Sequence, residues 1–330
     1  MSLLSPKFTR RTFLISAILC STISTAYAAP LKIGYSDWPG WVAWQIAIDK
    51  GWIKQAGVDA SFQWFDYSAS LEAFAAGKLD AVLATNGDTL VTGSAGGRGT
   101  MILATDYSSG NDMIIGKAGI KSLKDLVGQS VAVETGLVDH LLLINGLKKA
   151  GIAENAIKLV NAKTNELPQI LASGSVSAIG AWQPVAGQAL KATAGAHPLY
   201  TSADEPGLIY DVLAVSPNSL NKNRADWIKL TQVWDKVVTY INDPKTQSDA
   251  LKIMAQRSGG GITPESYKKL LYGTHLLNLA DNQAVMVKAK GFKSLYGSTY
   301  FVDKFNVNQG IYRTAQNVDS YIDPKLVQGK

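Results

Sequence analysis

The sequence contains very little cysteine and histidine. Its only cysteine is Cys20, and its three histidines, His140, His197 and His275, are widely separated. Cys20 lies in an N-terminal segment that we expect to be cleaved off, which leaves a mature chain with no disulfide and no cysteine-ligated metal. The histidines have neither the spacing of metal ligands nor a partner pattern for general-base catalysis. We therefore expect no metal, no cofactor and no catalytic residues.

Clusters of basic residues are also absent. The chain has 32 Lys and Arg against 26 Asp and Glu, and Lys7, Arg10 and Arg11 belong to the N-terminal segment, which leaves 29 against 26. No run of Lys or Arg is long enough to follow nucleic acid or a membrane surface. Hydrophobic residues at 46% and charged residues at 18% are typical of a globular protein. The roughly 300 residues of the mature chain favour two lobes over a single core.

The longest N-terminal apolar stretch runs only from residue 13 to residue 23, whereas an anchor in a bilayer needs about 20 apolar residues. It follows the basic residues and precedes Ala26-Tyr27-Ala28, the order of a signal peptide with a small-x-small cleavage site. We expect residues 1–28 to be a signal peptide, cleaved near Ala28, and the mature protein to be periplasmic.

Two details refine this expectation. Residues 9–14, TRRTFL, resemble the twin-arginine signal of proteins exported in the folded state, and general secretory export is the alternative. A lipoprotein anchor is disfavoured because the residue before Cys20 is Leu19, which is not small.

Beyond the signal, strand and helix patterns alternate with short polar junctions, which predicts an α/β fold with mainly parallel sheets. The expected strands are 31–35, 60–65, 80–84, 157–160, 176–182 and 208–216. Residues 121–133 are expected to form a short helix, a Gly turn and a strand. The expected helices are 41–55, 70–76, 139–150, 166–172, 226–241 and 264–271. We assign residues 30–113 and 213–330 to lobe 1 and residues 114–212 to lobe 2, joined by a two-segment hinge.

Several runs of sequence resemble a known family. They are Ile33-Gly34-Tyr35, residues 48–52 (IDKGW), residues 71–81 (LEAFAAGKLDA), residues 122–133 and Gln183-Pro184. This pattern is similar to the nitrate, sulfonate, taurine and thiamine-precursor group of periplasmic binding proteins. The resemblance covers essentially the whole mature chain. It implies a type II periplasmic-binding fold and a monomeric substrate-binding component of an ABC importer. The partners would be a small-molecule ligand and a permease with a cytoplasmic ATPase.

Two further segments, residues 35–41 (YSDWPGW) and 65–68 (FDYS), resemble most closely the branch of this family encoded beside urea carboxylase genes. That branch is associated with guanidine or urea-type substrates.

In open α/β sheets the ligand lies beyond the carboxyl ends of the strands. The residues expected there are rich in carboxylates and aromatic rings and include no Lys or Arg. Carboxylates accept paired N–H bonds and aromatic faces attract cations, so the set favours a small planar cation, guanidinium above all. The predicted ligand-binding residues are Asp37, Trp38, Trp41, Asp66, Tyr67, Asn86, Asp88, Asp106, Asp112, Glu134, Trp182 and Asp211. Thr135, Asp139 and Gln183 follow strands of lobe 2 in the same way.

Other interpretations stay open at this point. Asp is a preferred helix N-cap for purely structural reasons. The ligand could be urea, a thiamine-precursor pyrimidine, a sulfonate or nitrate. An enzyme on the same fold is a further alternative, although the related pyrimidine-precursor synthases carry a cysteine-rich iron motif that is missing here. A sensor or adaptor role is not distinguished from transport by the sequence.

Overall fold

The computed structural model describes Ser2 and residues 29–330. The expected signal peptide, its twin-arginine segment and its cleavage site therefore lie outside the described residues. Among the residues described, no helix has both the length and the apolar character needed to cross a membrane.

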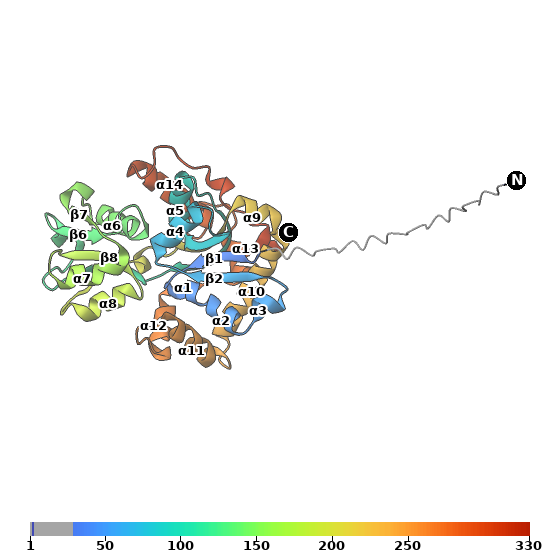
Figure 1. Cartoon of the computed structure of the whole chain (residues 1–330). Helices are drawn as coiled ribbons and strands as arrows, with labels where there is room; N and C mark the ends of the chain where they lie inside the picture. The colour runs from blue at the N-terminus through green and yellow to red at the C-terminus, as the bar shows by residue number, and fades with distance from the viewer. Residues whose placement is uncertain (1, 3–28) are drawn as a thin grey trace.

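The chain forms two sheets, each covered by helices on both faces (Figure 1). The first is six-stranded, in the order β11-β4-β10-β3-β1-β2. Its strands are β1 (Leu31–Tyr35), β2 (Ala60–Trp64), β3 (Ala81–Thr85), β4 (Thr100–Ser108), β10 (Tyr210–Val215) and β11 (Thr274–Leu276). The second is five-stranded, in the order β7-β6-β8-β5-β9. Its strands are β5 (Asp112–Gly116), β6 (Ser130–Val133), β7 (Lys158–Asn161), β8 (Ala178–Trp182) and β9 (His197–Thr201). The predicted α/β class with two lobes is confirmed.

The sheets are mixed rather than mainly parallel. The pairs β1·β2, β1·β3, β6·β7 and β6·β8 are parallel, as the βαβ pattern predicts. However, β10 is antiparallel to both β3 and β4, and β5 is antiparallel to both β8 and β9. The cause is the path of the chain, because β5 is the strand that enters the second sheet and β10 is the strand that returns to the first.

These two strands also locate the passage between the sheets. The chain leaves the first sheet after β4, enters the second at Asp112, leaves it after Thr201 and rejoins the first at Tyr210. Residues 112–113 and 210–212 thus hydrogen-bond in the sheet opposite to the lobe assigned to them from the sequence. The division into lobe 1 and lobe 2 is otherwise retained as a proposal.

The helices flank the strands in the order that the sequence indicates, with differences in detail. The predicted helix 41–55 is three short helices, α1 (Pro39–Val42), α2 (Trp44–Asp49) and α3 (Trp52–Gln55). The last break falls at Gly51, whose φ of 67° is a left-handed conformation that interrupts a right-handed helix. The other helices before the return to lobe 1 are α4 (Tyr67–Ala75), α5 (Asn86–Ser94), α6 (Val138–Lys149), α7 (Leu167–Ala172) and α8 (Val185–Ala192).

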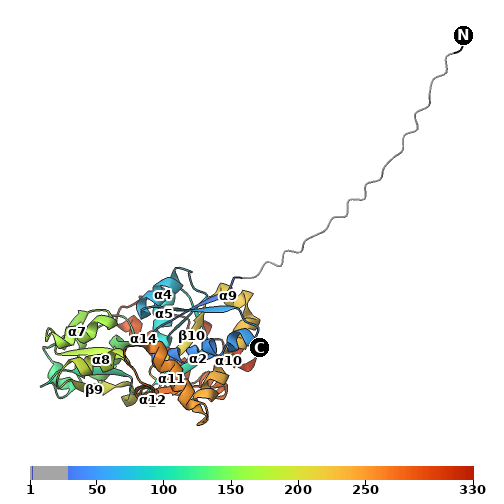
Figure 2. The same cartoon turned by 60° about the horizontal axis from the view of Figure 1, so that its bottom comes forward.

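The C-terminal third is mostly helical and completes lobe 1 (Figure 1). Its helices are α9 (Pro217–Lys222), α10 (Arg224–Asn242), α11 (Gln247–Ser258), α12 (Pro264–Tyr272), α13 (Leu279–Val285) and α14 (Leu295–Asn308). Trp44 of α2 packs against Trp234 of α10 with ring centroids 5.1 Å apart, and neither side chain is exposed. This contact anchors the late helices to the first sheet. Figure 2 shows α11 and α12 beside the junction with lobe 2, the lobe to which α7 and α8 belong.

Candidate functional site

Strand ends from both sheets meet at the junction between the lobes. Asp37 and Trp38 follow β1, Asp66 and Tyr67 follow β2, and Asn86 follows β3. Because β10 and β5 are antiparallel to their neighbours, their first residues lie at this same edge. Asp211 of β10 is opposite both Thr85 and Asp106, and Asp112 of β5 is opposite Trp182. The topology thus gathers carboxylates from both lobes.

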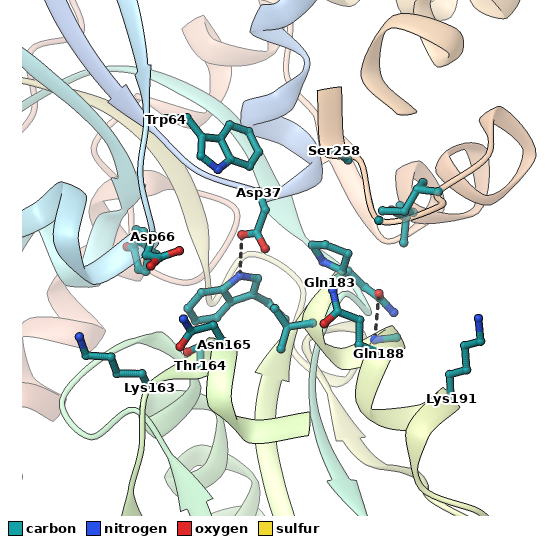
Figure 3. A pocket seen from close by; sticks show the side chains of 18 of the residues that line it. Asp37, Trp64, Asp66, Lys163, Thr164, Asn165, Gln183, Gln188, Lys191 and Ser258 are labelled. Carbon is teal, nitrogen blue, oxygen red and sulfur yellow. Dashed lines mark hydrogen bonds between the residues drawn. The ribbon is translucent and has the colours of Figure 1, made fainter. Parts of the chain in front are cut away.

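The larger of two cavities at this junction has a volume of about 560 Å³ and opens toward solvent (Figure 3). We call it the outer cavity. Lobe 1 contributes Asp37, Trp64, Asp66 and Tyr67, and the segment from Ser258 to Leu270, between and within α11 and α12, closes another side. Lobe 2 contributes polar side chains that include Glu134, Thr164, Asn165, Trp182, Gln183 and Gln188.

Asp37 and Trp182 connect the two lobes across the outer cavity. The indole Nε1 of Trp182 donates to Asp37 Oδ1 at 3.5 Å, the long limit of a hydrogen bond (Figure 3). Burial raises the pKa of Asp37 to about 6, against the lowering effect of the Trp182 contact. Trp64 lies at the rim, and the guanidinium of Arg257 stacks over its ring at 4.1 Å while donating to Tyr35 Oη.

The second cavity lies deeper and is much smaller, about 10 Å³, which is close to the room that one water needs. We call it the inner cavity. It is lined by Trp38, Trp41, Tyr67, Thr85, Asp112, Val138, Trp182, Ile209 and Asp211. Tyr67 and Trp182 line both cavities and so form the partition between them. The walls of the inner cavity come from both lobes, so a separation of the lobes would widen it.

Aromatic rings surround the inner cavity in a continuous arc. The ring centroids of Trp38 and Trp41 are 6.4 Å apart, those of Trp41 and Tyr67 are 5.2 Å apart, and Tyr67 meets Trp182 edge-on at 5.3 Å. All four side chains are buried. Trp41 Nε1 has no hydrogen-bond partner among the described residues.

The carboxylates around this arc are unusually buried. Asp88, Asp106, Asp112, Asp139 and Asp211 are each at most 2% exposed. Asp88 Oδ2 accepts from Tyr67 Oη at 2.7 Å, and Asp106 accepts from Trp38 Nε1 at 2.9 Å and from Thr105 Oγ1 at 3.0 Å. Within residues 29–330, no donor reaches Asp112 Oδ2, Asp211 Oδ2 or either oxygen of Asp139.

Burial raises the pKa of every one of these five aspartates. It raises the pKa of Asp88 and Asp112 to about 7 and that of Asp106 to about 6. For Asp139 and Asp211, burial followed by repulsion from neighbouring carboxylates raises the pKa well above its usual range. The carboxylates do not come together as a metal centre, because no group of metal-ligating side chains is formed within the part of the chain described.

All predicted site residues except Asn86 therefore divide into four groups. Asp37, Asp66 and Glu134 face the outer cavity only, whereas Trp38, Trp41, Asp112 and Asp211 face the inner cavity only, and Tyr67 and Trp182 face both. Asp88 and Asp106 lie behind the inner cavity and bond to its aromatic walls.

Asn86 reaches neither cavity. Its amide donates to Ser298 Oγ and Thr299 Oγ1 and accepts from the backbone of Tyr210, which ties α5 to α14. We do not retain it in the proposed site.

The sequence analysis found no basic residue at the strand ends, but three lysines line the outer cavity. Lys163 precedes a short 3₁₀ turn, and Lys191 and Lys269 lie in the last turns of α8 and α12. Lys163 lies two residues after β7, so the expectation that no Lys or Arg follows a strand is wrong at this position. Lys191 and Lys269 come from helices, which the strand-end argument does not cover. No Lys or Arg of residues 29–330 lines the inner cavity. Asp139, in the first turn of α6, was named among the lobe 2 strand ends but not among the predicted site residues.

One glycine also belongs to this arrangement. A Cβ on Gly40 of α1 would clash with the carboxylate of Asp106, so the absence of a side chain lets α1 approach the buried acid.

The sequence model of the NMT1/THI5-like family matches residues 38–247. The chain belongs to this family. A binding protein of Brucella abortus is 28% identical over 183 residues, which are 54% of this chain and 56% of that protein. The chain thus spans about half the length of the curated relatives it matches.

Solved structures give the fold of this NMT1/THI5-like protein. The alkanesulfonate-binding protein SsuA of Xanthomonas axonopodis, bound to MOPS, has a TM-score of 0.74 at 16% identity, covering 90% of this chain and 99% of SsuA. The nitrate-binding protein NrtA of Synechocystis has a TM-score of 0.71 at 12% identity, covering 92% and 89%. The desulfurization enzyme DszB has a TM-score of 0.64 at 14% identity, covering 92% and 98%. The chain has the two-lobed fold of periplasmic binding proteins.

Proposed function

We propose that this protein is the extracytoplasmic substrate-binding component of an ABC importer and that it captures a small planar cation, guanidinium, in the inner cavity. The observation that carries the proposal concerns two residues, Asp112 and Asp211. Each has a buried Oδ2 without a partner, both line the inner cavity, and that cavity is walled by Trp38, Trp41, Tyr67 and Trp182.

A buried, unpaired carboxylate is strongly unfavourable, and removing the partner of a buried charge costs several kcal/mol. A cluster of such groups without a basic partner is therefore expected to keep protons or to acquire a cation. Guanidinium is planar and carries N–H donors on its edge and a delocalised charge on its face, which matches carboxylates at the rim of an aromatic enclosure. Stacking on a desolvated Trp adds about 2 kcal/mol.

Anionic ligands are the second candidate, because SsuA and NrtA are named as binding alkanesulfonate and nitrate. The lysines of the outer cavity support that alternative. However, the carboxylates of the inner cavity would repel an anion, and the lysine side chains are exposed to solvent. Urea would use the same hydrogen-bonding edge as guanidinium without the charge. Both need an inner cavity wider than the room for one water, and a thiamine-precursor pyrimidine would need it wider still.

The proposed role requires no catalysis. DszB has a similar fold and is an enzyme, so the fold alone does not decide the point. Our proposal is a binding protein because the buried acids of the inner cavity are not accompanied by a histidine, cysteine or lysine among the residues described. We further propose a monomer in the periplasm, with a permease and its ATPase as partners, and membership of the guanidine and urea branch.

A thermal-shift screen tests the proposal. The mature protein is heated with guanidinium, urea, nitrate, an alkanesulfonate and an aminopyrimidine at equal ionic strength. A ligand present at 100 times its Kd stabilises the fold by about 2.7 kcal/mol. Guanidinium at about 1 mM lowers stability by less than about 0.01 kcal/mol as a denaturant, so the two effects separate cleanly. We expect the largest shift with guanidinium; a larger shift with nitrate or the sulfonate would contradict the proposal.

A further inference from the structure

Asp106 and Asp211 form an acid pair behind the inner cavity. They are opposite residues on the antiparallel strands β4 and β10, and both side chains are buried. Like charges directly opposite in an antiparallel pair destabilise a sheet. Two ionised carboxylates buried in one site without a basic partner are strongly unfavourable. One of the two carboxyl groups is therefore expected to keep its proton, which it can donate to the other.

The surrounding donors indicate where that proton lies. Asp106 accepts from Trp38 Nε1 and from Thr105 Oγ1, two bonds that stabilise its ionised form. No donor reaches Asp211 Oδ2, and Asp211 lines the inner cavity. Asp106 is therefore the ionised acceptor and Asp211 the proton donor.

The other titratable neighbours are acids, tyrosines and one histidine. Five acids interact electrostatically with the cluster or adjoin it. They are Asp88 on α5, Asp112 on β5, Asp139 on α6, Glu134 after β6 and Asp37 after β1. The tyrosines are Tyr67 on α4, Tyr107 on β4, Tyr210 on β10 and Tyr267 on α12, and His275 of β11 stacks on Tyr107. Within residues 29–330, no Lys or Arg makes a salt bridge or hydrogen bond to any of the buried carboxylates.

On the basis of the proposed function, we propose that an arriving guanidinium ion replaces the proton shared by Asp106 and Asp211. The ion pairs with the Asp211 carboxylate, the Asp211 O–H bond breaks, and the proton leaves through the outer cavity to solvent. One positive charge enters as one leaves, so the net charge buried behind the partition does not change. Before binding, the proton prevents repulsion between the Asp106 and Asp211 carboxylates. After binding, the positive charge of the ligand prevents it.

Two consequences distinguish this exchange from simple binding. Release of about one proton per ligand makes the association constant rise up to about tenfold per pH unit while the pair is protonated. A neutral ligand cannot replace the proton, so urea should bind without release. Burial also raises the pKa of Asp112 to about 7, so Asp112 could release a proton at the pH of the experiment. The test must therefore identify which carboxyl group releases the proton.

The experiment is titration calorimetry of the mature protein with guanidinium chloride at pH 7, in phosphate and in Tris, whose heats of protonation differ greatly. The difference between the two apparent enthalpies gives the number of protons released. We expect about one for guanidinium in the wild-type protein. A dye-based proton count on the same protein, and Kd values from pH 5.5 to pH 7.5, give independent measures that need no variant.

The decisive variant is Asp106→Asn, which keeps an oxygen acceptor for Trp38 and places an amide donor against Asp211. It replaces the shared proton by a permanent N–H bond, so guanidinium should still bind, with proton release reduced below about one third and a flattened pH profile. Asp59→Asn, at the exposed position directly before β2, is the matched control and should release as much as the wild type.

Four outcomes overturn the proposal in distinguishable ways. Guanidinium binding without proton release refutes the exchange and leaves the proposed function intact. Release that is unchanged in Asp106→Asn, or equal release on titration with urea, refutes the Asp106–Asp211 pair as the source. If guanidinium does not bind at all, the proposed function and the exchange fail together.

Discussion

The indole Nε1 of Trp38 donates a hydrogen bond of 2.9 Å to Asp106 Oδ1, and both side chains are buried. Trp38 follows β1 and Asp106 lies near the end of β4, strands that are not neighbours in the sheet. The bond therefore fixes one aromatic wall of the inner cavity to the acid pair behind it. In our account, the wall and the charge of the binding site are one hydrogen-bonded unit.

Trp38→Phe tests this unit. It removes the donor and leaves a buried carboxylate short of one bond, and a hydrogen bond to a charged group contributes about 1.5–3 kcal/mol. We expect guanidinium binding to weaken by roughly 10-fold to 100-fold, measured by calorimetry, with a lower melting temperature. Trp52→Phe is the control, because Trp52 is also largely buried but lies in α3, where it packs against Tyr240. It should lower stability without changing Kd; equal losses of affinity in both variants would contradict a specific role for Trp38.

Contact between the lobes through Asp37 and Trp182 gives a second prediction. Ligand contacts to both lobes are made only in the closed form, so guanidinium should shift the population toward it. Small-angle scattering should show a smaller radius of gyration at saturating guanidinium. Asp37→Asn weakens only a long hydrogen bond, and a bond of this kind contributes about 0.5–1.5 kcal/mol. We expect Kd to rise roughly 2-fold to 12-fold, mainly through faster dissociation. A radius of gyration that does not respond to ligand would argue against closure.

The buried acids predict an unusual dependence of stability on pH. Burial raises the folded-state pKa of Asp88 and Asp112 to about 7, above the unfolded value of 3.8. Their protonated forms are favoured by folding, so this contribution is fully present below about pH 4 and is lost as the pH rises through about 7. Circular dichroism melts of the ligand-free protein should give a higher melting temperature at pH 5 than at pH 8. Guanidinium should reduce the difference by stabilising the ionised carboxylates. A melting temperature that rises from pH 5 to pH 8 would contradict the burial of these groups in their neutral forms.

The sequence predicted the main parts of this arrangement for a clear physical reason. Parallel strands bring their carboxyl ends to one edge, so Asp37, Trp38, Asp66 and Tyr67 could be placed directly from β1 and β2. Asp211 could be included because the strand 208–216 was expected to return to lobe 1. The alternating pattern likewise predicted most strands within two residues of their observed bounds.

Other features depend on packing that no local pattern encodes. From the strand pattern alone, Asp37, Asp66 and Asp88 are equal candidates for ligand carboxylates. Only the tertiary structure separates an outer from an inner cavity and directs Asp112 and Asp211 into the inner one. Lys191 and Lys269 reach the outer cavity through the packing of α8 and α12, whereas Lys163 follows β7 and could have been placed from the strand pattern. The break at Gly51 was missed because the apolar periodicity continues across it.

The most direct test of the central claim is the affinity for guanidinium of wild-type protein, Asp112→Asn and Asp59→Asn, measured by titration calorimetry at pH 7. Removing one partner of a buried, hydrogen-bonded charge pair costs about 2–5 kcal/mol, so Asp112→Asn should weaken binding roughly 30-fold to several thousand-fold. Asp59→Asn should leave the Kd unchanged, and circular dichroism should show that all three proteins are folded. If the wild-type protein binds guanidinium and Asp112→Asn binds it equally well, the inner cavity does not hold the cation and our account of the site is wrong.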